Sequence, residues 1–183
     1  GSDVRATVQL QTPSNFVIDR VRVSRKPVTQ GSSNWWVTVQ VSNQAGGSDV
    51  QLNLADSSKT WVKLYDSGGQ PVDYYFRLPG GLAGSGGRIL AAGKRDSLIF
   101  QLKSSGSRIG PMSVAAQVTA VETNRNKSIT ALASGVLGDN LTIQSKAQIL
   151  FVAKSLQPAY VSPGDVVRYQ ISASNAGGST LVL

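Results

Sequence analysis

The stretch "VTVQVSNQAGGSDV", residues 37–50, decides the fold of this chain. Together with the two residues before it, it alternates apolar and polar side chains. One face carries the apolar set, which is Trp35, Val37, Val39 and Val41. A period of two is typical of an antiparallel strand with one buried and one solvated face. Trp35 is therefore expected in the core and Trp36 on the outer face, and the Gly-Gly pair that follows predicts a turn.

A second stretch, "YQISASNAGGSTLV" at 169–182, follows the same pattern. The match extends upstream, where 10–31 aligns with 143–164 at an offset of 133 residues, as Gln144 against Gln11. A period of this length indicates one domain per repeat. We therefore expect three parts. They are a tag remnant and the last strand of a preceding repeat at 1–12, a complete repeat at 13–145, and the first strands of a truncated repeat at 146–183.

The rest of the complete repeat consists of short alternating segments separated by turn residues. They predict strands at 50–54, 61–65, 73–78, 97–103, 113–122 and 141–144. The Gly-rich segment 78–93 predicts a long, mobile loop. Short strands at this spacing favour an all-β fold, namely an immunoglobulin-like antiparallel β-sandwich in tandem repeats with the second one truncated.

The turn residues of the two copies carry a resemblance to a known family. They are Pro27, Thr29, Gly31, Asn43, Gly46 and Gly47, and then Pro163, Gly164, Asn175, Gly177 and Gly178. A Pro-Gly turn before a strand that ends in Asn and Gly resembles the bacterial extracellular Ig-like repeat modules, the CARDB-type and conserved-repeat domains. This resemblance implies an extracellular array that acts as a stalk, spacer or adhesive unit, and it implies no catalytic residues.

Composition argues against several classes of function. The chain has no Cys and no His, which removes the usual zinc and iron–sulfur ligands, thiol nucleophiles and imidazole-based triads. Its net charge of +8 is spread without a basic run, so no specific nucleic-acid partner is indicated. The printed sequence contains no apolar run long enough for a transmembrane segment. We expect no enzyme activity, no catalytic residues, no metal and no cofactor.

The carboxylates are scattered, and most lie at predicted turns: Asp49, Asp56, Asp66, Asp73, Asp96 and Asp139. Asp at such positions usually accepts hydrogen bonds from its own turn. No pair with the arrangement of a glycosidase stands out.

Exposed aromatic and basic side chains are the candidate ligand-binding residues. The set is Trp36, Trp61, Tyr75, Arg25 and Lys26. An outward indole offers a flat platform for a sugar ring, but it also suits packing under a loop or against an adjacent repeat. Arg20 and Arg22 share one face of an alternating strand, which is typical of a solvated face.

The sequence thus predicts a non-catalytic structural, spacer or adhesive repeat of a bacterial surface or secreted protein. Its partners would be neighbouring repeats or other copies of the same protein, with strand exchange as one mode of assembly. The alternative is a module that binds carbohydrate or an anionic cell-wall polymer through its exposed aromatics. The expected location is extracellular or at the cell surface, with signal and anchor outside the printed sequence.

Overall fold

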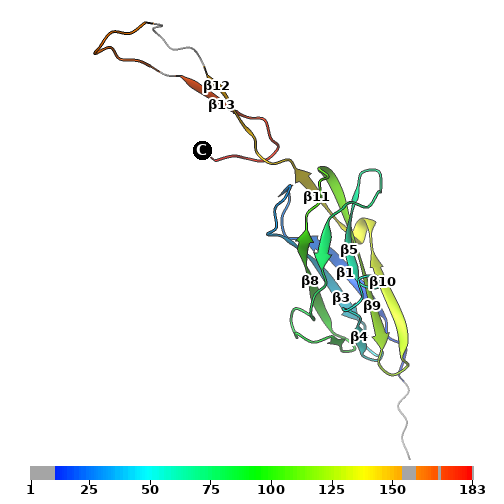
Figure 1. Cartoon of the computed structure of the whole chain (residues 1–183). Coiled ribbons are helices and arrows are strands. Elements are labelled where there is room, and N and C mark those ends of the chain that lie inside the picture. Colours follow the sequence, from blue (N-terminus) through cyan, green and yellow to red (C-terminus); the bar gives the residue numbers. More distant parts are fainter. Residues whose placement is uncertain (1–10, 154–159, 169, 183) are drawn as a thin grey trace, which may run out of the picture. The chain divides into compact units, whose positions relative to one another are not determined.

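The computed structural model describes residues 11–153, 160–168 and 170–182, and these form an all-β chain with one short 3-10 turn, Gly135–Leu137. The chain divides into two compact units, Gly1–Ile143 and Gln144–Leu183 (Figure 1). The strand expected near the N-terminus lies almost entirely outside the described residues. Within the described part, Thr12 forms an isolated parallel bridge to Gly47.

A four-stranded antiparallel sheet forms one layer of the first unit. In spatial order its strands are β1 (Phe16–Val23), β3 (Trp36–Asn43), β8 (Arg95–Ser104) and β6 (Tyr75–Arg77). Val39 lies opposite Val21 on β1 and Leu98 on β8, so apolar residues meet across the strands. The register shifts at Asp19, between Ile18 and Arg20.

The second layer is built around the long strand β9 (Gly110–Glu122). Its other strands are β2 (Val28–Thr29), β11 (Asp139–Gln144), β4 (Val50–Leu52), β7 (Ile89–Leu90), β10 (Lys127–Ala133) and β5 (Trp61–Asp66). The first half of β9 pairs with β11 and β5, and its second half pairs with β10 and β4. β9 therefore runs the length of the unit and connects both of its ends.

The core lies between these two sheets. Trp35 and Phe100 from the four-stranded layer are almost fully buried, as are Leu64 and Val114 from the other layer. The Trp35 ring meets the Phe76 ring nearly at a right angle, with centroids 5.3 Å apart. Two antiparallel sheets across one apolar core make a β-sandwich-like arrangement, and the burial of Trp35 confirms the prediction from alternation.

Each of the six strands predicted downstream of the opening stretch overlaps an observed strand, namely β4, β5, β6, β8, β9 and β11. β10 was missed because its "KSITALA" sequence lacks large β-branched side chains at most positions. The prediction of a long loop at 78–93 is corrected in part. The segment contains β7, Leu82 is buried, and the Ala83 amide donates to the Ser97 carbonyl at 2.8 Å.

The second unit contains the two-stranded antiparallel sheet of β12 (Ile149–Ala153) and β13 (Ile171–Asn175). Ile149 pairs with Asn175, as Phe16 pairs with Asn43 in the first unit. The exposure of the two pairs of strands differs, because Phe151 is 68% exposed and its counterpart in the alignment, Ile18, is 4% exposed.

Candidate ligand-binding face

The outer face of the four-stranded sheet gathers polar, basic and aromatic side chains from strands that are distant in sequence. Trp36 on β3 lies opposite Gln101 on β8, which in turn lies opposite Arg77 on β6. In the neighbouring row, Thr38 lies between Arg22 on β1 and Ile99 on β8. The strand register therefore places these residues in adjacent rows on one surface.

A hollow of about 490 Å³ opens on the β1–β3 half of this face. It is lined by Arg20, Arg22, Val23, Ser24, Trp36, Thr38 and Gln40. The Trp36 amide donates to Ser24 Oγ at 2.9 Å, and the Trp36 carbonyl accepts from the Ser24 amide at 3.0 Å. These contacts fix the backbone beneath the indole, whose residue is 41% exposed.

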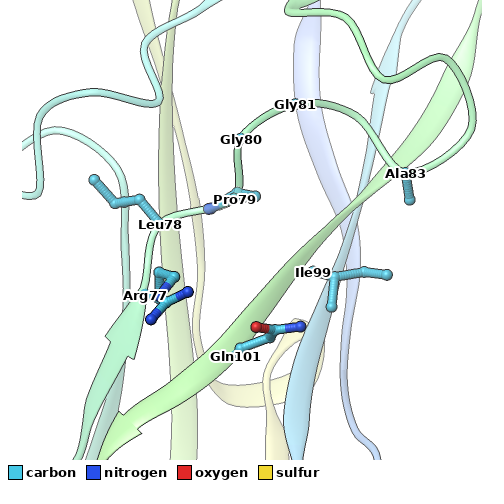
Figure 2. Close-up of a pocket in the computed structure, with 8 residues that line it drawn as sticks. All are labelled: Arg77, Leu78, Pro79, Gly80, Gly81, Ala83, Ile99 and Gln101. Carbon is cyan, nitrogen blue, oxygen red and sulfur yellow. The ribbon is translucent and has the colours of Figure 1, made fainter.

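A second hollow of about 310 Å³ lies on the β8–β6 half of the same face. Figure 2 shows Arg77 and Gln101 on neighbouring strands, with the Gly80–Gly81 loop arching beside Ile99. Since Gln101 pairs directly with Trp36 and Ile99 with Thr38, the two hollows adjoin across β3 and β8. We call this surface, from Arg20 and Arg22 through Trp36 to Arg77, the basic strip.

The basic strip carries uncompensated positive charge. None of the ion pairs among the described residues includes Arg20, Arg22 or Arg77. The nearest acid in sequence, Asp19, is engaged elsewhere, because its carboxylate pairs with Arg95 at 2.9 Å and accepts from Ser42 Oγ at 2.9 Å. The guanidinium groups of the strip are therefore available to an anionic ligand.

Trp61 and Tyr75 line a different cavity, of about 470 Å³, between β5 and β6. Tyr75 is 61% exposed, and the ammonium of Lys63 lies 4.7 Å from the centre of the Trp61 ring. A cation this close to an indole face is attracted by the ring quadrupole. The Lys63 amine already covers one face of the Trp61 ring. The Trp61 ring is therefore less accessible to a sugar than the Trp36 ring.

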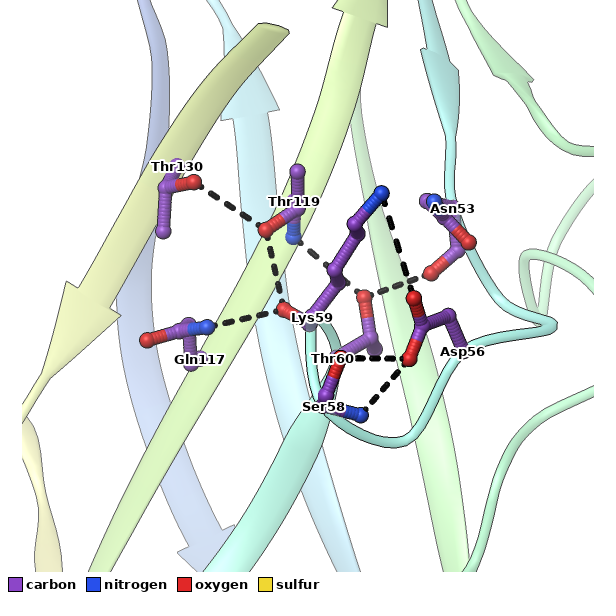
Figure 3. Close-up of polar contacts among 8 residues, drawn as sticks. All are labelled: Asn53, Asp56, Ser58, Lys59, Thr60, Gln117, Thr119 and Thr130. Carbon is purple, nitrogen blue, oxygen red and sulfur yellow. Dashed lines mark hydrogen bonds and ion pairs between the residues drawn. The ribbon is translucent and has the colours of Figure 1, made fainter.

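A polar network holds the loop before β5 against β9 (Figure 3). Trp61 is the first residue of β5 and directly follows this loop. Thr60, which is fully buried, donates to the Asn53 carbonyl at 2.6 Å and accepts from the Thr119 amide at 3.3 Å. Thr119 Oγ1 and Gln117 Nε2 both donate to the Lys59 carbonyl, at 2.9 and 3.0 Å. The loop thereby covers Thr119 on the outer face of the second sheet.

The two basic candidates, Arg25 and Lys26, follow the end of β1, and Lys26 forms an ion pair with Asp139. Asp139 also accepts from the Val23 amide at 2.8 Å. Burial raises the pKa of this carboxyl, but the hydrogen bonds from Lys26 and Val23 outweigh that effect, and the pKa is lowered. Lys26 thus joins β1 to the start of β11.

The turn role predicted for the aspartates is confirmed at Asp56 and Asp66. It is wrong for the main contacts of three others, because the carboxylates of Asp49, Asp73 and Asp96 accept from amides of distant segments, those of Ala92, Ser107 and Gly84. Asp56 Oδ1 accepts from the Ser58 amide at 2.9 Å, and Asp66 Oδ1 accepts from the Gly68 amide at 3.0 Å. Asp139 differs, because it joins two strands as well as accepting from the next amide, that of Asn140, at 2.9 Å.

Glu122 is a buried acid that the sequence pattern did not mark for any structural role. Its residue is 1% exposed, and Oε1 accepts from Ser48 Oγ at 2.8 Å and from the Ser14 amide at 3.1 Å. The hydrogen bond from Ser48 is the main cause that lowers the pKa of Glu122. The carboxylate therefore holds the segment before β1 against the end of β9.

The structure thus separates the five predicted ligand residues into three places: Trp36 on the basic strip, Trp61 and Tyr75 in one cavity, and Arg25 and Lys26 after β1. It adds Arg20, Arg22, Arg77 and Gln101 to the surroundings of Trp36. Arg20 and Arg22 were recognised as one outward face, and their i, i+2 spacing was the signal. Arg77 and Gln101 could not be placed there without the strand order.

Among the described residues, no group of three or more acids, His or Cys lies close enough to hold a metal ion. No helix in the described part of the chain has the length and apolar character that crossing a membrane requires. Comparison with known protein families, curated proteins and solved structures finds no match to this chain.

Proposed function

We propose that the chain is a non-catalytic spacer or adhesive segment built of tandem Ig-like repeats, as in bacterial surface or secreted proteins. The observation that carries the proposal is the path of the chain through the first unit. The segment before β1 is held at the end of β9, where Ser14 bonds Glu122. The last residue of the unit, Ile143, pairs with Gly110 at the start of β9.

Entry and exit therefore lie at opposite ends of a strand of 13 residues, a separation of about 40 Å. Units joined in this way lengthen an array with each repeat, which is what a spacer requires. β1 and β11, the strands nearest the two ends, are joined by the contacts of Asp139 with Val23 and Lys26. Tension on the ends loads β1 along its length, so its hydrogen bonds to β3 are sheared together.

The second unit supports the repeat. The Asn43 side chain donates to the Ser48 carbonyl at 2.9 Å, and the Asn175 side chain donates to the Ser179 carbonyl at 2.7 Å. The Gln44 amide donates to the Asn15 carbonyl, and the Ala176 amide donates to the Gln148 carbonyl. The same backbone and side-chain contacts thus recur where the sequence alignment places them.

Single-molecule pulling tests the load-bearing role. The chain has no Cys, so Gln11→Cys with Gln144→Cys gives thiol handles at opposite ends of the first unit. We expect one cooperative unfolding event that lengthens the chain by about 420 Å, given about 3.5 Å per extended residue and the starting separation.

The matched control pulls from one end of the same unit. Gln11 contacts Asn124 in the turn after β9, which places both residues at the same end. In the variant Gln11→Cys with Asn124→Cys, the force therefore separates the paired strands one hydrogen bond at a time. The opposite-end handles should require the higher force at the same loading rate. An equal or lower force, or unfolding in several small steps, would overturn the proposal.

A further inference from the structure

We propose that the basic strip on the outer face of the four-stranded sheet binds an acidic polysaccharide, with Trp36 against a sugar ring and Arg20, Arg22 and Arg77 on its carboxylates. This site is independent of the spacer role, because it uses the outward side chains of β1, β3, β8 and β6. The inward side chains of those strands form the core.

Charge is the first support. Arg20 and Arg22 line one hollow and Arg77 lines the adjoining one, and none of the three belongs to an ion pair among the described residues. A guanidinium matches a carboxylate with two parallel hydrogen bonds, which favours a sugar acid over a neutral sugar. Uncompensated arginines on both sides of Trp36 complement a ligand with repeated negative charge.

The side chains between the arginines supply the second support. Thr38, Gln40 and Gln101 offer hydroxyl and amide groups that both donate and accept, as a sugar hydroxyl does. Trp36 offers an exposed indole whose backbone is fixed by Ser24. A rigid aromatic surface beside hydrogen-bonding side chains suits a ring with one apolar face and a polar edge.

The length of the strip is the third support. β1 and β6 are three interstrand spacings apart, which is about 14 Å at roughly 4.8 Å each. This favours a chain of sugars lying across the strands over a single small molecule. Single-stranded nucleic acid is the less suitable occupant, because it prefers successive aromatic platforms, one for each stacked base.

Binding of the full 183-residue chain to polygalacturonate tests the site, with the fully methyl-esterified polymer as the uncharged comparison. We expect a change in tryptophan fluorescence with the acid form and at least a tenfold weaker response with the ester. Trp36→Ala should weaken binding to the acid form about tenfold, by analogy with the loss of a base-stacking aromatic. Arg20→Gln with Arg22→Gln should weaken it at least as much.

The matched control removes the same charge away from the strip. Arg125 and Lys127 are both exposed and lie at the turn between β9 and β10, in the other sheet, so Arg125→Gln with Lys127→Gln lowers the net charge equally. Circular dichroism and thermal melting check that each variant folds. Retention of binding by this control and loss by the strip variants supports the site. Equal loss in both pairs of variants would mean attraction by net charge alone, and would overturn it.

Two further probes separate the possible ligands. A single-stranded oligonucleotide of matched charge, or anionic lipid vesicles, should bind at least tenfold more weakly than polygalacturonate. Equal or tighter binding that is lost in the Arg20 and Arg22 variant would show that the strip recognises phosphate, and would overturn the assignment to sugar acids. Raised salt should weaken the binding of polygalacturonate, but Trp36→Ala should still weaken that binding further at high salt.

Discussion

The β1–β3 and β12–β13 strand pairs begin in the same register and differ in their burial. Phe16 pairs with Asn43 and Ile149 pairs with Asn175, and the match continues through three residue pairs, up to the bulge at Asp19 that β12 lacks. In the first unit Val39, four residues before Asn43, is completely buried, whereas Ile171, four residues before Asn175, is 66% exposed. Local pairing therefore begins in the same way in both units, while the environment of the apolar side chains differs.

The difference shows which interactions belong to a strand pair and which belong to the sandwich. Alternation and the Asn contact at the strand end recur in both units, since they depend on neighbouring backbone. Burial of the apolar face in the first unit comes from β9 and its partners in the opposite sheet. A two-stranded sheet without such a layer is marginally stable in water.

The largest expected effect comes from truncating matched apolar side chains. Ile18→Ala should lower the free energy of unfolding of the first unit by about 2 to 5 kcal/mol, because it leaves a cavity in the core. Phe151→Ala should change it by less than about 0.5 kcal/mol, since Phe151 is exposed. Denaturant unfolding followed by tryptophan fluorescence reports the first unit, which holds all three Trp residues.

Hydrogen exchange of β12 and β13 completes this test, because it reports the second unit directly. Amide protection there should be similar in the parent chain and the Phe151→Ala variant. A large loss of protection would contradict the comparison and indicate that the exposed face is covered in solution.

A smaller effect should follow from removing the matched asparagines. Asn43 is 1% exposed, and its side chain donates to the carbonyls of Ser48 and Leu90 at 2.9 and 3.2 Å. Asn43→Ala should cost about 1 to 3 kcal/mol, because two carbonyls lose a buried partner. Asn175→Ala should leave thermal unfolding of the first unit unchanged. Equal shifts in melting temperature for the Asn43 and Asn175 variants would contradict the distinction between the buried and the exposed asparagine.

The smallest effect concerns Glu122, which reinforces the first unit alone. Its pKa is lowered below the ordinary value near 4.5, chiefly by the hydrogen bond from Ser48. A lowered pKa means that this carboxylate stabilises the fold above about pH 4.5 and loses that contribution as pH falls through the folded-state pKa. Glu122→Gln should therefore flatten the acid side of a plot of stability against pH.

The control for this measurement removes an acid from the second unit. Asp165 accepts from the Ser162 amide, and Asp165→Asn leaves Glu122 and its partners intact. The Asp165 variant should keep the acid-dependent slope of the parent chain. An unchanged slope in the Glu122 variant would show that other carboxylates account for it.

Much of the fold was predictable because alternation is a local signal. The strand at 36–43, the inward Trp35 and the outward Trp36 follow from the order of residues alone, and the structure confirms them. β10 was not predicted because its core-facing positions include two alanines, which lack the large side chains typical of a strand. The candidate site was predictable in one residue, Trp36, while its neighbours were considered only as a solvated surface or not at all.

The sequence by itself determined which side chains of each strand face inward, because successive residues of a strand point to opposite sides. It also determined the recurrence of one strand pattern near both ends of the chain. Tertiary structure decided which outward residues became neighbours. Arg22, Trp36 and Arg77 meet on one face only because β1, β3, β8 and β6 are adjacent in that order. Strand order and register depend on long-range packing of two sheets, and no local pattern encodes them.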